Sequence, residues 1–309
     1  MKWIEIKAKF DSENKYVAAD LVSNVFFDTD FKGVVVVDPD DEPVEGWGVG
    51  AEEKPDGDAV IGYLPKNGFT GKRIEIFKNK LHDLKQRSGI TCLVEFNEID
   101  EKNWENSWKE YFWPEKIGSK IVVKPTWREY DRKDGEIVIE LDPGMAFGTG
   151  SHPTTSLCVQ LIEKYVKNKD SILDIGTGSG ILLIAAAMVG AGKLFGIDID
   201  EVAVDIAKQN LLVNHIKPEI FQVKTGTLTA TFNGATDSFD VVVGNILTDV
   251  IADLVEDVRD ILKADGIFIC SGIIEGKKDF ILSKMTGAGF KILETHVKGD
   301  WVAIAGIKQ

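Results

Sequence analysis

The segment Leu173-Asp174-Ile175-Gly176-Thr177-Gly178-Ser179-Gly180 joins an apolar run to a helix-forming run, and it decides the fold of the second half of the chain. The apolar run at 172–175 does not alternate with polar residues, which is typical of a strand buried on both faces. Glycines at a turn from strand to helix let a ligand approach the backbone closely. The helix that follows offers unpaired N–H groups in its first turn.

Strand-like and helix-like runs alternate on the C-terminal side of this segment. After the helix at 181–189, the sequence predicts strands at 194–199, 240–244 and 266–271, and helices at 202–213, up to 262 and around 279–286. Such alternation predicts a parallel, doubly wound α/β sheet with right-handed crossovers. Residues 291–297 and 301–307 are separated by three residues, a spacing that permits a hairpin and hence one antiparallel strand.

The second strand of this series ends at Asp198, which lies 22 residues beyond Gly176. In a βαβ unit this spacing places a carboxylate beside the glycine turn, where it can accept hydrogen bonds from both hydroxyls of a ribose. Taken alone, the glycine turn can be a tight turn that binds no ligand. Taken alone, Asp198 can be a solvated aspartate at the end of a strand. Taken together, the two features favour a nucleoside site. Ile181 occupies the place of the third glycine in the dinucleotide fingerprint, so an NAD enzyme is disfavoured.

The first hundred residues predict a different, smaller domain. Strands are expected at 3–9, 34–37, 59–64 and 91–99, with helices at 14–27 and around 74–84. The order strand, helix, strand, strand, helix, strand is that of a ferredoxin-like α+β domain. Between its middle strands, residues 38–58 read as a long exposed loop. Trp104, Trp108 and Phe112 follow at helical spacing, which favours an apolar stripe that packs a linker helix onto a domain over a ligand cage.

Two further segments carry a resemblance to a known family. Residues 142–155 read D-P-G-M-A-F-G-T-G-S-H-P-T-T, and residues 245–247 read N-I-L. With the glycine turn, Asp198, the W-x-x-x-W linker and the small N-terminal domain, the chain resembles the PrmA-type ribosomal protein L11 methyltransferases. These are class I S-adenosylmethionine-dependent enzymes. The resemblance covers essentially the whole chain; Thr248 and Ser151 depart from the family pattern without removing a group assigned to the chemistry.

The resemblance implies a fold, a domain plan and a set of site residues. The fold is a Rossmann-like seven-stranded sheet, mostly parallel with one antiparallel strand, plus the ferredoxin-like domain. Residues 1–99 would recognise the substrate, 100–120 would form the Trp-rich linker, and 121–309 would bind S-adenosylmethionine and transfer the methyl group. No metal is implied. The residues that would contact the cofactor are Phe147, Thr155, Gly176, Gly178, Asp198 and Asn245, and Asn245 would also be the catalytic residue.

For Thr155 and Asn245 a physical reason supports the role, and for Phe147 two roles stay open. Pro153 suits a first helical turn, so the hydroxyl of Thr155 and the free N–H groups near it would hold the cofactor carboxylate. Asn245 is placed to accept a hydrogen bond from a neutral amine, against the alternative of a strand-end turn residue. Phe147 would either cover the cofactor or pack its loop. His152 precedes a proline in the same loop, which favours a structural role over that of a general base.

The family implies methylation of lysine ε-amines, N-terminal α-amines or both, on ribosomal protein L11 of the large subunit. The alternatives are a methyltransferase for another protein or a small amine, and an S-adenosylmethionine-binding module without catalysis. We expect no direct nucleic-acid partner, because 36 Lys and Arg against 50 Asp and Glu give a net charge of −14. We expect a cytoplasmic location, because neither a signal peptide nor an apolar run of membrane-spanning length is recognisable. We also expect a monomer.

Most of the negative charge belongs to one segment. Residues 38–58 hold nine acidic residues and one lysine, a net charge of −8. A basic partner such as a ribosomal protein and a merely solvated loop explain this concentration equally well.

Overall fold

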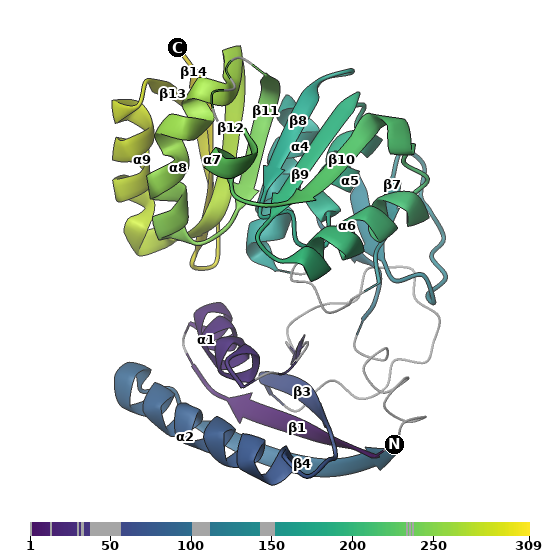
Figure 1. Cartoon of the computed structure of the whole chain (residues 1–309), viewed down its shortest axis with the longest axis vertical. Helices are drawn as coiled ribbons and strands as arrows, with labels where there is room; N and C mark the ends of the chain where they lie inside the picture. The colour runs from purple at the N-terminus through teal and green to yellow at the C-terminus, as the bar shows by residue number, and fades with distance from the viewer. Residues whose placement is uncertain are drawn as a thin grey trace. The chain divides into compact units, whose positions relative to one another are not determined.

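The computed structural model describes residues 2–12, 14–29, 31, 34–37, 57–100, 112–142, 152–232, 234, 236 and 238–309. The chain divides into two compact units, Met1–Trp113 and Pro114–Gln309, which are described separately (Figure 1). The division falls within the predicted linker 100–120. The tryptophans predicted to form its apolar stripe and most of the acidic segment 38–58 lie outside the described residues.

The first unit has the strand and helix order expected from the sequence. Its elements are β1 (Lys2–Phe10), α1 (Lys15–Phe27), β2 (Val34–Val37), β3 (Ala59–Pro65), α2 (Thr70–Ser88) and β4 (Cys92–Asp100). The sheet order is β2-β3-β1-β4, with antiparallel pairing throughout, so two βαβ connections interleave as in a ferredoxin-like domain. Helices α1 and α2 cover one sheet face through a core that includes Ile6, Val22, Phe26, Leu64 and Phe77.

The other face of this sheet also buries apolar side chains. Val35, Val37, Ala59 and Ile61 form a small cluster, and Phe112 packs against it. Phe112 is the one member of the predicted linker stripe that the structure describes. It packs on the small domain, as an apolar stripe would.

The second unit contains a seven-stranded sheet in the order β10-β9-β8-β11-β12-β14-β13. Its strands are β8 (Ser171–Ile175), β9 (Lys193–Asp198), β10 (Phe221–Thr225), β11 (Phe239–Asn245), β12 (Leu262–Ile274), β13 (Phe290–Lys298) and β14 (Trp301–Lys308). Only β14 runs antiparallel to its neighbours β12 and β13, and it forms a hairpin with β13. The predicted Rossmann-like sheet with one antiparallel strand is confirmed.

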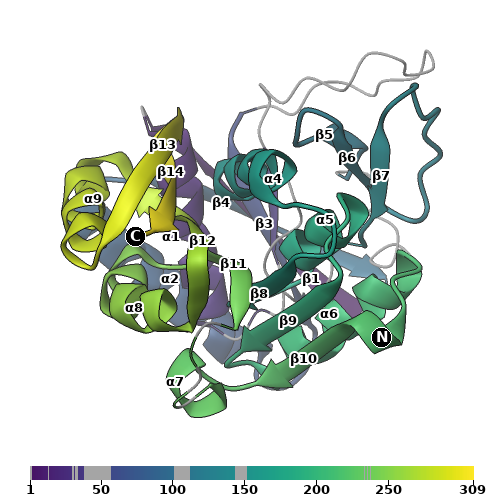
Figure 2. The ribbon, with the colours of Figure 1, turned by 90° about the horizontal axis from the view of Figure 1, so that it is seen from above.

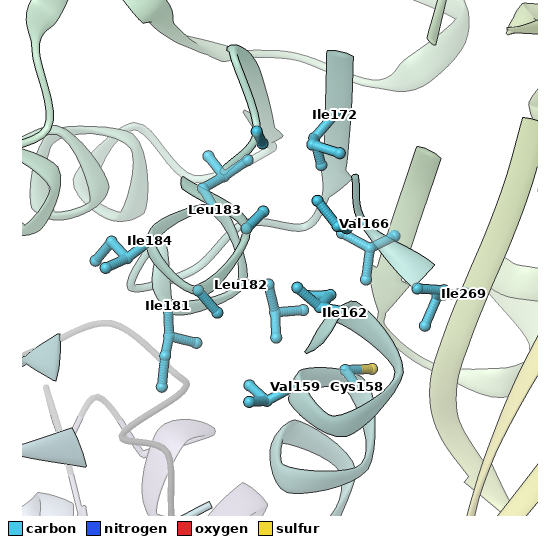
Figure 3. Packing of buried hydrophobic residues seen from close by; sticks show 14 of the residues in the cluster. Cys158, Val159, Ile162, Val166, Ile172, Ile181, Leu182, Leu183, Ile184 and Ile269 are labelled. Atoms are coloured by element: carbon cyan, nitrogen blue, oxygen red, sulfur yellow. The ribbon is translucent and has the colours of Figure 1, made fainter. Parts of the chain in front are cut away.

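Helices cover both faces of this sheet (Figure 2). On one face lie α4 (Pro153–Tyr165), α5 (Ile181–Met188) and α6 (Glu201–Val213); on the other lie α7 (Leu228–Thr231), α8 (Thr248–Ile261) and α9 (Lys278–Gly287). Short 3-10 turns occur at Pro218–Ile220 and Glu275–Lys277. Figure 3 shows Val159 and Ile162 of α4 packed with Ile172 of β8 and Leu182 of α5. Two separate apolar layers therefore pack against the two faces of the sheet and hold its strands in place.

Two parts of the second unit have weak sequence signals. A three-stranded sheet of β5 (Glu115–Lys116), β6 (Ile121–Lys124) and β7 (Ile137–Glu140) precedes α4, and β10 forms the edge of the large sheet. β5 has only two residues, and in β10 Val223 is the one buried residue, so neither shows the continuous apolar run of a central strand. Within the described residues, no helix is both long and apolar enough to cross a bilayer.

Candidate functional site

The glycine turn between β8 and α5 has a backbone that only glycine adopts without strain. Gly176, Gly178 and Gly180 have φ angles of 73°, 52° and 81°. A β-carbon on Gly176 would lie 2.4 Å from Cγ2 of Ile246, so this backbone must also remain bare for close packing. The turn therefore places backbone without side chains at the carboxyl end of β8.

Asp198 lies beside this turn because β9 pairs in parallel with β8. Its Oδ2 accepts a hydrogen bond from the Gly178 N–H at 2.9 Å, and its Oδ1 accepts one from the Asp200 N–H at 3.0 Å. A carboxylate offers about four lone-pair directions, so two bonds leave acceptor capacity for a ligand. The structure thus brings Asp198 and the turn together, in the geometry from which ribose binding is inferred.

Thr155 and Asn245 come from different elements and meet at the same sheet edge. Thr155 lies in the first turn of α4 and is 1% exposed, while Asn245 is the last residue of β11. The Asn245 Nδ2 donates to Thr155 Oγ1 at 3.4 Å. β11 is the neighbour of β8, with Gly244 opposite Ile175. The threonine, the asparagine and the glycine turn consequently share the carboxyl edge of adjacent strands.

His152 has a defined structural task at the start of α4. It is the N-cap residue, and its Nδ1 accepts a hydrogen bond from the Thr154 N–H at 3.3 Å and lies 2.7 Å from Thr154 Oγ1. Its ring also meets Trp301 edge-on, with centroids 5.1 Å apart. These contacts agree with the structural reading of His152. Phe147, the remaining predicted cofactor contact, lies outside the described residues.

Asp174 is a site residue to which the sequence alone assigns no role. Its side chain is completely buried on β8; Oδ2 accepts from Thr177 Oγ1 at 2.8 Å, and Oδ1 has no hydrogen-bond partner among the described residues. Burial raises the pKa of this carboxyl from 3.8 to about 7, against the lowering effect of the Thr177 hydrogen bond. An aspartate beside a glycine turn in the sequence is a signal for the site, but its burial becomes visible only in the fold.

Two large apolar side chains on the rim of the site project into solvent. Ile199, just after β9, is 79% exposed, and Leu247, just after β11, is 76% exposed. The loop that carries Leu247 is firmly held, because Ile246 N–H donates to Ser271 O at 3.2 Å and Thr248 Oγ1 donates to Gly272 O at 2.9 Å.

The residues present fit a nucleoside cofactor that also carries an amino-acid group. Asp198 offers oxygens to ribose hydroxyls, and the glycine turn offers a surface without side chains. The first turn of α4 offers the Thr155 hydroxyl. The free N–H groups predicted there are not found, because the N–H groups of Thr154, Thr155 and Ser156 all donate to His152. The buried Oδ1 of Asp174 adds an acceptor on β8 that has no partner among the residues the structure describes. Ligands of open α/β sheets bind outside the carboxyl ends of the strands, which is where these groups lie.

Comparisons with known proteins agree along the whole chain. The family model of ribosomal protein L11 methyltransferase (PrmA) matches residues 2–309. The chain is 41% identical over 304 residues to a ribosomal protein L11 methyltransferase of Desulforapulum autotrophicum, covering 98% of each chain. It is also 41% identical over 315 residues to the protein of that name from Alkaliphilus oremlandii, again covering 98% of each.

A solved structure has a similar fold over much of the chain. The ribosomal protein L11 methylase from Lactobacillus delbrueckii subsp. bulgaricus is 31% identical, with a TM-score of 0.58. The match covers 63% of this chain and 99% of that one. Sequence and fold converge, and the chain belongs to the ribosomal protein L11 methyltransferase family.

Proposed function

We propose that this chain transfers methyl groups from S-adenosylmethionine to amino groups of ribosomal protein L11. The target amines are lysine ε-amines, the N-terminal α-amine or both. The observation that carries the proposal is the meeting of Asn245 with Thr155 at the edge that also holds the glycine turn and Asp198. This contact supports Asn245 as the amide acceptor for the substrate, beside the residues assigned to the cofactor.

Thr155, Gly176, Gly178, Asp198 and Asn245 would hold the cofactor, together with Phe147. When bound, S-adenosylmethionine supplies an activated methyl group on a sulfonium. The protein therefore has to position the amine and the cofactor, exclude water from the site and keep the amine neutral. It does not need a nucleophile of its own. A rigid sheet edge suits this task. It is formed by the glycine turn that Asp198 holds, by the buried Thr155 and by the apolar layers beneath them.

The attacking amine must be neutral, although a lysine amine titrates near pH 10.4 in water. Desolvation at the site favours the uncharged form. Because the Asn245 Nδ2 faces Thr155, its Oδ1 is left to accept an N–H from the amine. A neutral amide does not hold the ammonium form as a carboxylate would, so the nitrogen lone pair stays available for in-line attack. The exposed Leu247 gives the aliphatic stem of a lysine an apolar surface next to this amide.

The division of labour between the units is also a proposal. Residues 1–99 would recognise the protein substrate, 100–120 would link the units, and 121–309 would carry out the transfer. The second unit holds the proposed chemistry and has two cores of its own, which leaves the first unit for recognition. We further infer that the chain acts as a monomer in the cytoplasm on the protein itself, without contacting nucleic acid.

The test is a transfer assay with isotopically labelled S-adenosylmethionine and separate acceptors. We expect label in purified L11, and loss of about 100-fold in kcat/KM for Asn245→Ala. Label in another ribosomal protein or a small amine, but not in L11, would replace the proposed substrate. Cofactor binding without transfer to any acceptor would identify a binding module.

A further inference from the structure

The carboxylate of Glu163 on α4 is enclosed by the backbone N–H groups of three consecutive residues. Its Oε2 accepts from Ser119 at 2.6 Å, and its Oε1 accepts from Lys120 at 2.8 Å and from Ile121 at 2.9 Å. Successive backbone N–H groups form a concave site for an anion, and hydrogen bonds to a charged acceptor are stronger than neutral ones. Glu163 therefore fixes the turn that connects β5 to β6.

The remainder of this helix face is directed at the same turn. Ser156 Oγ donates to the Ile117 carbonyl at 2.8 Å, and Gln160 Nε2 donates to Ser156 Oγ at 3.2 Å. A β-carbon on Gly118 would lie 2.6 Å from Glu163 Oε1, so the turn approaches too closely to carry a side chain there. Residues 156, 160 and 163 recur at helical spacing. One stripe of α4 thus holds residues 117–121.

The same helix begins at the proposed cofactor site. Thr155, which meets Asn245, directly precedes Ser156. With a rise of 1.5 Å per residue, Thr155 and Glu163 lie about 12 Å apart along the axis. The opposite stripe of α4 is fully packed, with Leu157, Cys158, Val159, Leu161 and Ile162 all buried. Because the helix moves as one body, a shift at either end reaches the other.

The turn held by Glu163 also marks the entry of the chain into the second unit, which starts at Pro114 and continues into β5. We propose that α4 couples the cofactor site to the end of the interdomain segment, and that Glu163 is the positioning residue that holds this end. Cofactor seated at Thr155 tightens the turn at 117–121, and a tight turn in return favours the cofactor. This inference rests on the proposed function, because it takes S-adenosylmethionine as the ligand at Thr155.

Hydrogen–deuterium exchange of the full-length chain tests this coupling by measuring the exchange rates of the amides of residues 119–121. We expect saturating S-adenosylmethionine to slow their exchange about fivefold or more in the parent protein. Glu163→Gln should abolish this slowing and raise the cofactor Kd, measured by calorimetry, by a comparable factor, because coupling between two sites is reciprocal. Gly118→Ala should act in the same direction by pushing on the carboxylate from the side of the turn.

Matched controls separate coupling from general damage. Glu256→Gln removes a carboxylate from the exposed face of α8, and Gly276→Ala adds a β-carbon that meets nothing within 4 Å; both should leave exchange and Kd unchanged. Circular dichroism confirms that each variant is folded. If the parent protein binds S-adenosylmethionine but residues 119–121 exchange at the same rate with and without it, the coupling is refuted while the proposed function stands. If the parent protein binds no S-adenosylmethionine, both fail.

Discussion

Asp198 has two tasks in this structure, one toward the protein and one toward the proposed cofactor. Its two oxygens accept N–H groups from Gly178 and Asp200, which ties the end of β9 to the glycine turn. The acceptor capacity that is left is what we assign to the ribose hydroxyls. A residue of this kind shapes the binding surface and also contributes to it.

Asp198→Ala should weaken S-adenosylmethionine binding by about 100-fold, because hydrogen bonds to a charged acceptor contribute about 1.5–3 kcal/mol each. Isothermal titration calorimetry measures the loss. Asp205→Ala, on the outer part of α6, is the control and should bind normally. An unchanged Kd for Asp198→Ala would refute the assignment of the ribose hydroxyls to this carboxylate.

Asp174 should make stability depend on pH in an unusual direction. Burial raises its pKa from 3.8 to about 7, so between these values the folded state keeps a proton that the unfolded state has released. The free energy of unfolding therefore falls as the pH rises through this window. Between pH 5 and pH 8, the titration of Asp174 alone should lower the free energy of unfolding by about 3 kcal/mol, since one pKa unit corresponds to about 1.4 kcal/mol.

Asp174→Asn removes this titration, and urea unfolding at several pH values tests it. Between pH 5 and pH 8, the free energy of unfolding of the variant should fall by about 3 kcal/mol less than that of the parent protein. Parallel curves for the two proteins would show that Asp174 is already ionised in the folded state at pH 5. The sequence marks Asp174 as part of a glycine-turn motif, but its pKa depends on the packing of α4 and the neighbouring strands, which no local pattern encodes.

At the scale of elements, the central strands of the large sheet were predictable from the sequence, whereas β10 and β5 were not. β8, β9 and β11 bury both faces, so they read as continuous apolar runs in the sequence. β10 at the sheet edge buries only Val223, and β5 has only two residues and pairs with β6 across a short turn, so neither has a continuous apolar run. The hairpin of β13 and β14 was predictable because only three residues separate the two strands.

The loop after β11 shows how one element positions another. A bulge interrupts the pairing of β12 with β14, and Gly272 within it has a φ of 86°. A β-carbon there would lie 2.1 Å from the Ile246 carbonyl oxygen. The bulge therefore supports the loop immediately after Asn245, and the N-I-L segment depends on a glycine from another strand.

Gly272→Ala should destabilise the protein by about 2–4 kcal/mol, because it combines a left-handed backbone with a steric clash. Displacement of the loop should also lower kcat for methyl transfer more than it weakens cofactor binding. Urea unfolding and steady-state kinetics measure the two effects. Gly276→Ala, which has open space around its β-carbon, serves as the control. Equal stability and kcat in both variants would show that the loop tolerates the shift.

At the scale of the whole molecule, the two units have separate cores, and the proposed chemistry lies in the second. A fragment of residues 114–309 should fold and bind S-adenosylmethionine with near-normal affinity. It should methylate L11 with kcat/KM reduced by about 100-fold, because the proposed recognition domain is missing. Calorimetry and the transfer assay test the two statements independently. Full activity of the fragment on L11 would refute the role given to residues 1–99.

The central claim is most directly tested by mass spectrometry of purified L11 after incubation with the full-length protein and S-adenosylmethionine. We expect the mass of L11 to rise in methyl-sized steps, with fragment spectra that place the methyl groups on lysine side chains, the N-terminal amine or both. Asn245→Ala should leave most of the L11 unmodified over the same time. An unchanged mass of L11, with a protein that is folded and binds the cofactor, would contradict the claim.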